Sequence, residues 1–225
     1  MKTIKIPLYT FSELEKEAQK NAKKHHRDIN TDYGWWESDY EDFITICKTI
    51  GIYIDPKDIY FRGFYSQGDG SCFGSKIEVS EFIKGISEKS WKSYAPTFNP
   101  NVVLCPIDSR IINLIAKGVI EVDMWTETSH RYYFVHYHSQ NYLYQKSNRD
   151  YIRIEEEFEK LDKWAKKTLE RLNDCFYKSL ENTYEYLISD KAVKETIIAN
   201  EYLFTKDGRT ADRLLNLNIE TSNNN

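Results

Sequence analysis

The chain has 225 residues, of which 40% are hydrophobic and 29% are charged, and its formal net charge is −4. This length and composition fit a folded globular protein with a sizeable core and exclude a chain that is disordered throughout. The acidic charge argues against a nucleic-acid-binding protein, because contacts with phosphates need a concentrated basic surface.

Two helices are predicted near the start of the chain. Ser12 and Glu15 have the spacing of a capping box and begin a helix that runs to about Arg27. The second helix covers residues 35–50, where apolar side chains recur every three or four residues. Gly51 then ends the pattern.

Two β-hairpins are predicted in the middle of the chain. In the first, segments 58–67 and 71–79 flank a tight Gly-Asp-Gly turn at 68–70. In the second, segments 120–128 and 131–144 alternate apolar and polar residues around a Thr-Ser-His turn. Their four strands predict one antiparallel sheet.

Four further helices are predicted from periodicity and capping signals. Pro106 near the start and Gly118 after the end favour a helix over 106–117. Ser189 and Asp190 provide capping residues for a short helix. The four expected helices cover residues 80–94, 106–117, 154–188 and 191–200.

The order of these elements predicts an α+β fold. About four antiparallel strands are expected to be packed by helices, and the long amphipathic helix near the C-terminus needs a broad surface to lie against. The sequence contains no internal repeat and no Pro- or Ser-rich linker. We therefore expect one domain over residues 1–225, with a subdivision near 147–150 as the alternative.

The sequence also predicts a location and a redox state. It has no apolar run long enough to span a bilayer, and its start, MKTIKIPLYTF, lacks the apolar core of a secretory signal. We expect a cytoplasmic protein with no membrane partner. The cysteines lie far apart with no Cys-x-x-Cys pair, so four free, buried thiols and no zinc site or other cofactor are expected; they are Cys47, Cys72, Cys105 and Cys175.

The first candidate site is the glycine-rich first hairpin. Glycines let a backbone approach a ligand closely, and polar side chains here could bind a nucleotide-like molecule. The segment does not match a phosphate-binding loop. The alternative is that the glycines only provide the positive φ angles of a turn. The candidate ligand-binding residues are Arg62, Gln67, Gly68, Asp69 and Gly70.

The second candidate site lies in the second hairpin. Strand alternation places His136 and His138 on one face, where two imidazoles could chelate a metal ion. A third ligand could come from His130, or from Asp69 if the two hairpins meet. The alternative is a polar stripe on the solvent-facing side of a sheet.

The third candidate site is the Trp35–Trp36 pair. Adjacent side chains cannot both face one core from a helix, so one ring could anchor a partner. The alternative is that Trp35 packs under the preceding loop. No nucleophile elbow, His-Glu-x-x-His motif or Cys–His pairing is evident, so no catalytic residue is predicted.

The order of FSELEKEAQKNA, DYGWWESDYEDF, IYFRGFYSQGDGSCFGS, a His/Tyr-rich strand and SDKAVKETIIANEYLFTKDGR resembles a family of phage and prophage proteins. Members of that family are often labelled as the antitoxin of a toxin–antitoxin stability system. SQGDG and the ANEYLFTKDG of residues 199–208 are the most specific segments. Tyr65, where the family has Trp, and Cys72, where a small or apolar residue is usual, are departures. The resemblance implies a phage or prophage origin and a host-cell cytoplasmic location.

These observations lead to three hypotheses. The first is a non-enzymatic, antitoxin-like or counter-defence protein that neutralises a protein partner, a toxin or a host defence factor, through an acidic surface rich in Tyr and Trp. The second is a protein that binds or hydrolyses a nucleotide-like ligand at the glycine-rich hairpin, with the histidines as further contacts. The third is a metal-dependent enzyme that uses His136 and His138.

Overall fold

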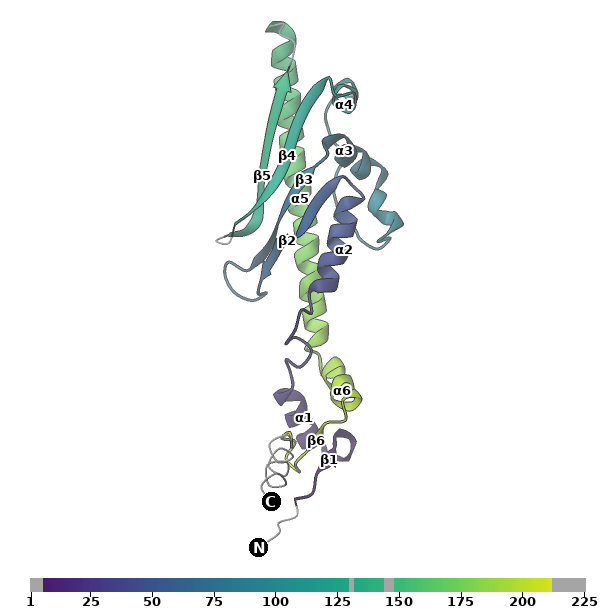
Figure 1. Ribbon diagram of the computed structural model, residues 1–225, viewed down its shortest axis with the longest axis vertical. Coiled ribbons are helices and arrows are strands. Elements are labelled where there is room, and N and C mark those ends of the chain that lie inside the picture. Colours follow the sequence, from purple (N-terminus) through teal and green to yellow (C-terminus); the bar gives the residue numbers. More distant parts are fainter. Residues whose placement is uncertain (1–5, 130–131, 144–147, 212–225) are drawn as a thin grey trace, which may run out of the picture. The chain divides into compact units, whose positions relative to one another are not determined.

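The computed structural model describes residues 6–129, 132–143 and 148–211 (Figure 1). It confirms the predicted α+β fold, with an antiparallel four-stranded sheet and a long helix, α5 (Asn148–Leu187), near the C-terminus. The contacts divide the chain into two compact units. The central unit runs from Trp36 to Glu181, and the terminal unit combines the residues up to Trp35 with those from Asn182 onward. The subdivision near 147–150 stays a prediction, because residues 144–147 lie outside the described part.

The central unit holds the sheet and most of α5. Its strands follow the order β2-β3-β4-β5, and each neighbouring pair is antiparallel. The two predicted hairpins are therefore β2–β3 and β4–β5, and they join through β3 and β4. The elements before α5 are α2 (Glu37–Lys48), β2 (Ile52–Arg62), β3 (Gly70–Ile77), α3 (Val79–Glu88), the 3₁₀ turn Ser90–Ser93, α4 (Ser109–Ala116), β4 (Ile120–Ser129) and β5 (Tyr132–Leu143).

Strand β2 begins earlier than predicted. The sequence analysis placed its start at Asp58, but the strand begins at Ile52 and includes Pro56. Its register shifts between Ile54 and Ile59, and β2 is an edge strand. Proline is tolerated at such a bulge and at a sheet edge, because no ladder hydrogen bond from its nitrogen is needed there.

One face of the sheet and the inward faces of α2, α3 and α5 enclose an aromatic core. Phe43 of α2 stacks on Phe176 of α5 with ring centroids 4.4 Å apart and meets Phe73 of β3 edge-on at 5.4 Å. Phe82 of α3 packs against Trp164 of α5 at 4.9 Å. Full burial of such a side chain contributes about 1.5–3 kcal/mol. These rings hold the helices on that face.

Buried polar contacts fix the position of α5 on the sheet. The Asn173 side chain donates from Nδ2 to the Ser71 carbonyl at 2.9 Å, and its Oδ1 accepts from the Ser71 hydroxyl at 2.9 Å. Between strands, the Thr126 hydroxyl donates to the Phe73 carbonyl at 2.8 Å and lies 2.9 Å from the Ser75 hydroxyl. Because these groups are buried, each needs its partner to offset desolvation.

The terminal unit has its own small core. Helices α1 (Lys16–His25) and α6 (Asp190–Ala199) pack together beside a two-stranded sheet of β1 (Tyr9–Thr10) and β6 (Leu203–Phe204). The end of α5 also belongs to this unit. The buried residues of the core are Phe11, Leu14, Ala18, Ala22, Val193, Ile197 and Phe204.

Several predicted helix ends differ from the structure. The helix predicted from 106 begins at Ser109, and the one predicted from 154 begins at Asn148. The capping box is formed by Thr10 and Glu13, not by Ser12 and Glu15, and it caps the 3₁₀ turn Phe11–Glu13 that precedes α1. The helix predicted over 80–94 stops at Glu88, because Lys89 adopts the left-handed conformation. Ser189 caps α6 through its hydroxyl, as predicted.

The four cysteines are free thiols. Cys47 and Cys72 are buried as expected, but Cys105 and Cys175 are only half-buried. Burial raises the pKa of the Cys105 thiol to about 11, so this group stays protonated at neutral pH. Within the described part of the chain, no helix has both the length and the apolar character that a membrane span requires.

Candidate functional site

The second face of the sheet carries exposed and half-buried side chains. Along β4 and β5, alternation turns Trp125, Glu127, His136 and His138 to this face and turns buried neighbours to the helix-covered side. We call this surface the open face. One cross-strand row of the register runs across all four strands, and its members are Tyr53, Lys76, Trp125 and His138.

Aromatic stacking orders the middle of the open face. The rings of Trp125 and His138 are stacked, with centroids 5.3 Å apart and planes 15° apart. Glu127 accepts a hydrogen bond from the indole Nε1 of Trp125 at 3.0 Å, and its other oxygen lies 3.5 Å from His138 Nε2. One carboxylate therefore holds both rings, which keeps the indole in a fixed orientation.

A second stack lies beside the first. Phe134 and His136 are stacked with centroids 4.3 Å apart, and Phe134 is 51% exposed. The Nε2 atom of His136 is buried and has no hydrogen-bond partner among the described residues. The open face thus presents two aromatic pairs: Trp125 and His138 stack across β4 and β5, and Phe134 and His136 stack along β5.

A hollow of about 620 Å³ opens on this face between β2 and β4. Gly74 lines it, and an added Cβ there would lie 3.2 Å from the Asp58 Cβ. A side chain there would therefore crowd Asp58. The residues that line it are Tyr53, Asp55, Asp58, Gly74, Ser75, Lys76, Trp125, Thr126, Glu127 and Thr128.

The charge of the hollow is negative. Asp55, Asp58 and Glu127 line it, and Lys76 is the one cation among the described residues that line it. Lys57, beside the hollow, pairs with Asp55 at 3.3 Å. The backbone N–H of Lys57 donates to Asp55 at 3.1 Å and lowers the pKa of that carboxyl, so it is ionised at neutral pH. Aromatic rings beside carboxylates suit the cationic head of Lys or Arg, because the ring face and the anion both attract it.

The glycine-rich loop between β2 and β3 is held by Asp69 from within the loop and by Tyr177 of α5. The Asp69 carboxylate accepts from the backbone N–H groups of Tyr65 at 2.9 Å and Ser66 at 2.7 Å. The Tyr177 hydroxyl of α5 donates to the Gly63 carbonyl at 2.7 Å. Asp69, a predicted ligand-binding residue, therefore stabilises the loop. The loop spans residues 63–69 and is longer than the tight turn predicted at 68–70.

The other predicted residues of this hairpin have different surroundings. Gly68 has φ +91° and open space around its Cα, as a turn glycine needs. At Gly70, an added Cβ would lie 2.5 Å from the Tyr133 carbonyl, so glycine lets β5 approach β3 closely. Arg62 ends β2 opposite Gly70, and both Arg62 and Gln67 are exposed.

The two adjacent tryptophans belong to different compact units, and both are half-buried. Trp35 packs against Tyr184 in the terminal unit, with centroids 5.6 Å apart. Trp36 packs edge-on against Phe61 in the central unit at 5.8 Å. Each ring thus has an aromatic neighbour within its own unit.

The predicted histidine site is partly described. His136 and His138 lie on the same face of β5, and each is stacked on another ring. His130 lies outside the described residues. Among the residues that the structure describes, no three His, Cys, Asp or Glu side chains are grouped so that they could hold a metal ion.

Sequence reasoning singled out His136 and His138 on the open face but missed their neighbours Trp125 and Glu127. The alternation within 120–128 already turned Trp125 and Glu127 to the polar side of a strand. What the sequence could not give is the pairing of β3 with β4, which brings Tyr53 and Lys76 into the same row as Trp125.

The fold and this surface define a class: an α+β protein whose antiparallel sheet has one helix-covered face and one open, acidic and aromatic face. The chain belongs to the family described as Domain of unknown function (DUF8835), which matches residues 35–190. Comparison with curated proteins and comparison with solved structures each gave no match.

Proposed function

We propose that this chain is a non-enzymatic binding protein that neutralises a protein partner through the open face of its sheet. The partner would be a toxin or a host defence factor, and the chain would act as an antitoxin-like or counter-defence protein of phage or prophage origin. The phage assignment is supported by the resemblance in SQGDG and ANEYLFTKDG.

The observation that carries this proposal is the acidic, aromatic hollow around Trp125. Aromatic residues held in a fixed orientation are the usual anchors of protein interfaces, because they bury large areas at a small cost in conformational entropy. Here Glu127 already restrains Trp125 and His138. A partner therefore meets a surface that is ordered before binding.

The chemistry of the hollow specifies the kind of partner surface that it would take. A Lys or Arg side chain would enter beside Trp125 and Tyr53 and pair with Asp58, since Asp55 already pairs with Lys57. Such a charge-assisted contact is stronger in a partly dehydrated hollow than on a flat surface. We therefore propose a basic partner surface with at least one projecting cation.

The nucleotide-like ligand at the glycine-rich hairpin is the less supported alternative. The Asp69 carboxylate, its central polar group, is engaged by two backbone N–H groups of the same loop. A ligand that bound this carboxylate would have to replace those hydrogen bonds.

The test is affinity capture from phage-infected or prophage-bearing cells with the tagged chain as bait, followed by a direct binding measurement with the purified partner. Asp58→Lys should weaken binding at least tenfold, because it places a cation in the hollow. Trp125→Ala should have a similar effect through loss of the ring. Circular dichroism and thermal melting establish that both variants remain folded.

Glu41→Lys is the matched control. Glu41 is exposed on α2, and its replacement makes the same change in net charge as Asp58→Lys. If Glu41→Lys and Asp58→Lys weaken binding equally, the effect comes from net charge and the proposed surface is wrong. Binding that is unchanged in both Asp58→Lys and Trp125→Ala also contradicts the proposal.

A further inference from the structure

A second concave surface lies in the central unit, between α5 and the segment that follows the Ser90–Ser93 turn. Two hydrogen bonds with nitrogen donors hold this segment on α5. The indole Nε1 of Trp164 donates to the Val103 carbonyl at 2.8 Å, and the backbone N–H of Asp108 donates to Glu157 at 2.7 Å. Because both contacts are made along one helix, the segment lies over α5 as a wall.

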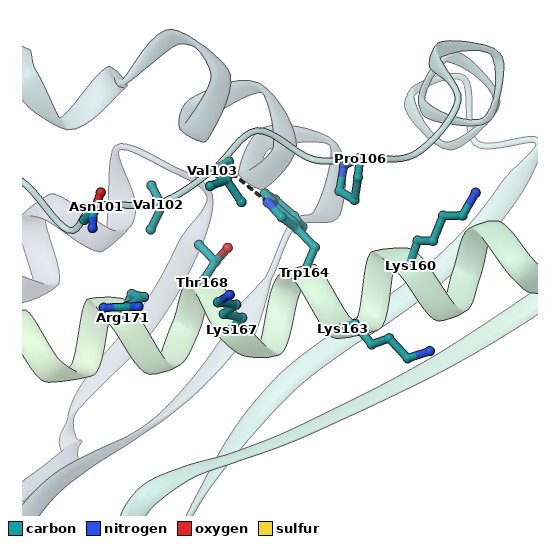
Figure 2. A pocket seen from close by; sticks show the side chains of 10 residues that line it. All are labelled: Asn101, Val102, Val103, Pro106, Lys160, Lys163, Trp164, Lys167, Thr168 and Arg171. Atoms are coloured by element: carbon teal, nitrogen blue, oxygen red, sulfur yellow. Dashed lines mark hydrogen bonds between the residues drawn. The ribbon is translucent and has the colours of Figure 1, made fainter.

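A groove of about 460 Å³ remains between this wall and the helix (Figure 2). Its floor is formed by Trp164 and Thr168, both buried, and its wall by Val102, Val103 and Pro106. Val103 is 65% exposed although it is apolar. The volume is within the range of small-molecule sites, which is about 300–1,000 Å³. The groove therefore offers an apolar surface of ligand size.

Basic side chains lie along this groove. Lys160, Lys163, Lys167 and Arg171 line it, and none of the described residues that line it carries a carboxylate. Their spacing of three and four residues places them along one side of α5. This concentration of positive charge contrasts with the net charge of −4 of the whole chain.

The four cations are not equivalent. Lys160 pairs with Glu157 at 2.5 Å, and Lys163 pairs with Glu159 at 3.3 Å. Figure 2 shows the Lys163 side chain directed away from the wall segment. Among the described residues, Lys167 and Arg171 have no carboxylate within ion-pair distance. These two charges are therefore available to a ligand in the groove.

We propose that this groove binds a small organic anion with a flat apolar body. The anionic group, a phosphate, sulfonate or carboxylate, pairs with Lys167 and Arg171, since a guanidinium matches two oxygens of such a group. The apolar body covers Val103 and Pro106 above Trp164. This site is distinct from the open face, and the proposal does not depend on the binding of a protein partner.

The test uses the fluorescent probe 8-anilinonaphthalene-1-sulfonate, which combines a sulfonate with flat aromatic rings. Titration of the folded chain should show saturable binding at a 1:1 ratio. Lys167→Glu and Arg171→Glu should each weaken binding at least tenfold. Lys166→Glu is the matched control, because it makes the same charge change at an exposed neighbour on α5 that does not line the groove.

Competition experiments measure separately what the anionic group and the apolar body contribute to binding. 1-Naphthyl phosphate and 1-naphthoate should displace the probe, and their ratio tells which anion the site prefers. Inorganic phosphate and neutral 1-naphthol should each displace it at least tenfold more weakly. Equal displacement by 1-naphthol, an equal effect of Lys166→Glu, or binding of an acidic peptide but of no small anion would overturn the proposal. Thermal melting of every variant distinguishes loss of the site from loss of the fold.

Discussion

Trp125 and His138 face each other across β4 and β5, and their rings are stacked at 5.3 Å with nearly parallel planes. The pair exists because two strands of one hairpin place residues 125 and 138 directly opposite each other on the open face. Glu127 contacts both rings, so the three side chains form one ordered group. This group provides the fixed aromatic surface on which the proposed protein-binding function depends.

The stacked pair of Phe43 and Phe176 should be a major source of stability for the central unit. Phe43→Ala removes a buried ring that contacts two others and should lower the free energy of unfolding by about 3–5 kcal/mol. Urea denaturation measures this. Tyr65→Ala, at a ring that is 71% exposed, should change the same quantity by no more than about 0.5 kcal/mol. Equal losses in the two variants would show that the aromatic core is not organised around Phe43.

Asn173 should fix α5 on β3 through its paired hydrogen bonds with Ser71. Asn173→Ala leaves the buried Ser71 groups without partners and should cost about 1–3 kcal/mol in the free energy of unfolding. In the double variant with Ser71→Ala, the loss should be smaller than the sum of the two single losses, because one interaction is removed in both. Additive losses in this double-mutant cycle would contradict the contact.

The Asp190 carboxylate should make the terminal unit sensitive to acid. It contacts Lys23 and, at 2.9 Å, Arg27, and the hydrogen bond from Lys23 lowers its pKa below the ordinary value of 3.8. Its stabilising contribution is therefore fully present above pH 3.8 and is lost as the pH falls through the lowered pKa. Asp190→Asn should accordingly lower the melting temperature at neutral pH.

The difference in melting temperature between the wild-type chain and Asp190→Asn should shrink as the pH is lowered below 3.8. Melting curves followed by circular dichroism from neutral pH down to that range measure it. Asp32→Asn, at an exposed carboxylate of the same unit, is the control for the loss of a charge. A difference that stays constant over this pH range would rule out the ion pairs as its cause.

Gly208 should be required in the Thr205–Arg209 turn of the terminal unit. It has φ +82°, and an added Cβ would lie 2.1 Å from the Ala18 carbonyl, so Gly208→Ala forces α1 and the turn apart. Gly68 has a similar φ of +91°, but the space around it is open. Gly68→Ala should therefore lower the free energy of unfolding by only about 1–2 kcal/mol. Hydrogen exchange at the α6 amides should accelerate in Gly208→Ala and stay unchanged in Gly68→Ala. The same acceleration in both would contradict this account.

The elements could be predicted from the sequence because their signals are local. The periodicity of apolar residues predicted α2 and α5, and the alternation of apolar and polar residues predicted β4 and β5. The predicted helix ends were less accurate where a helix stops at an unusual backbone conformation. At Lys89 the left-handed conformation ends α3, and no residue pattern in the sequence predicts it.

The candidate sites were harder to predict, because their residues come together only through strand pairing. Asp69 looked like a ligand group from its glycine neighbours, but its carboxylate binds the loop backbone. Trp125 belongs to the candidate surface because it stacks on His138 of its own hairpin and shares a row with Tyr53 of the other hairpin. The basic groove depends on a wall segment whose position over α5 has no sequence signature.

Photo-crosslinking tests the central claim most directly, because it reports which surface the partner contacts. p-Benzoylphenylalanine would replace Tyr53, which is 41% exposed beside the hollow, and in a second variant Tyr33, which is 89% exposed in the terminal unit. The proposal predicts that the partner, once captured, crosslinks to position 53 and not to position 33. Crosslinking at position 33 with none at position 53 would show that the open face is not the binding surface.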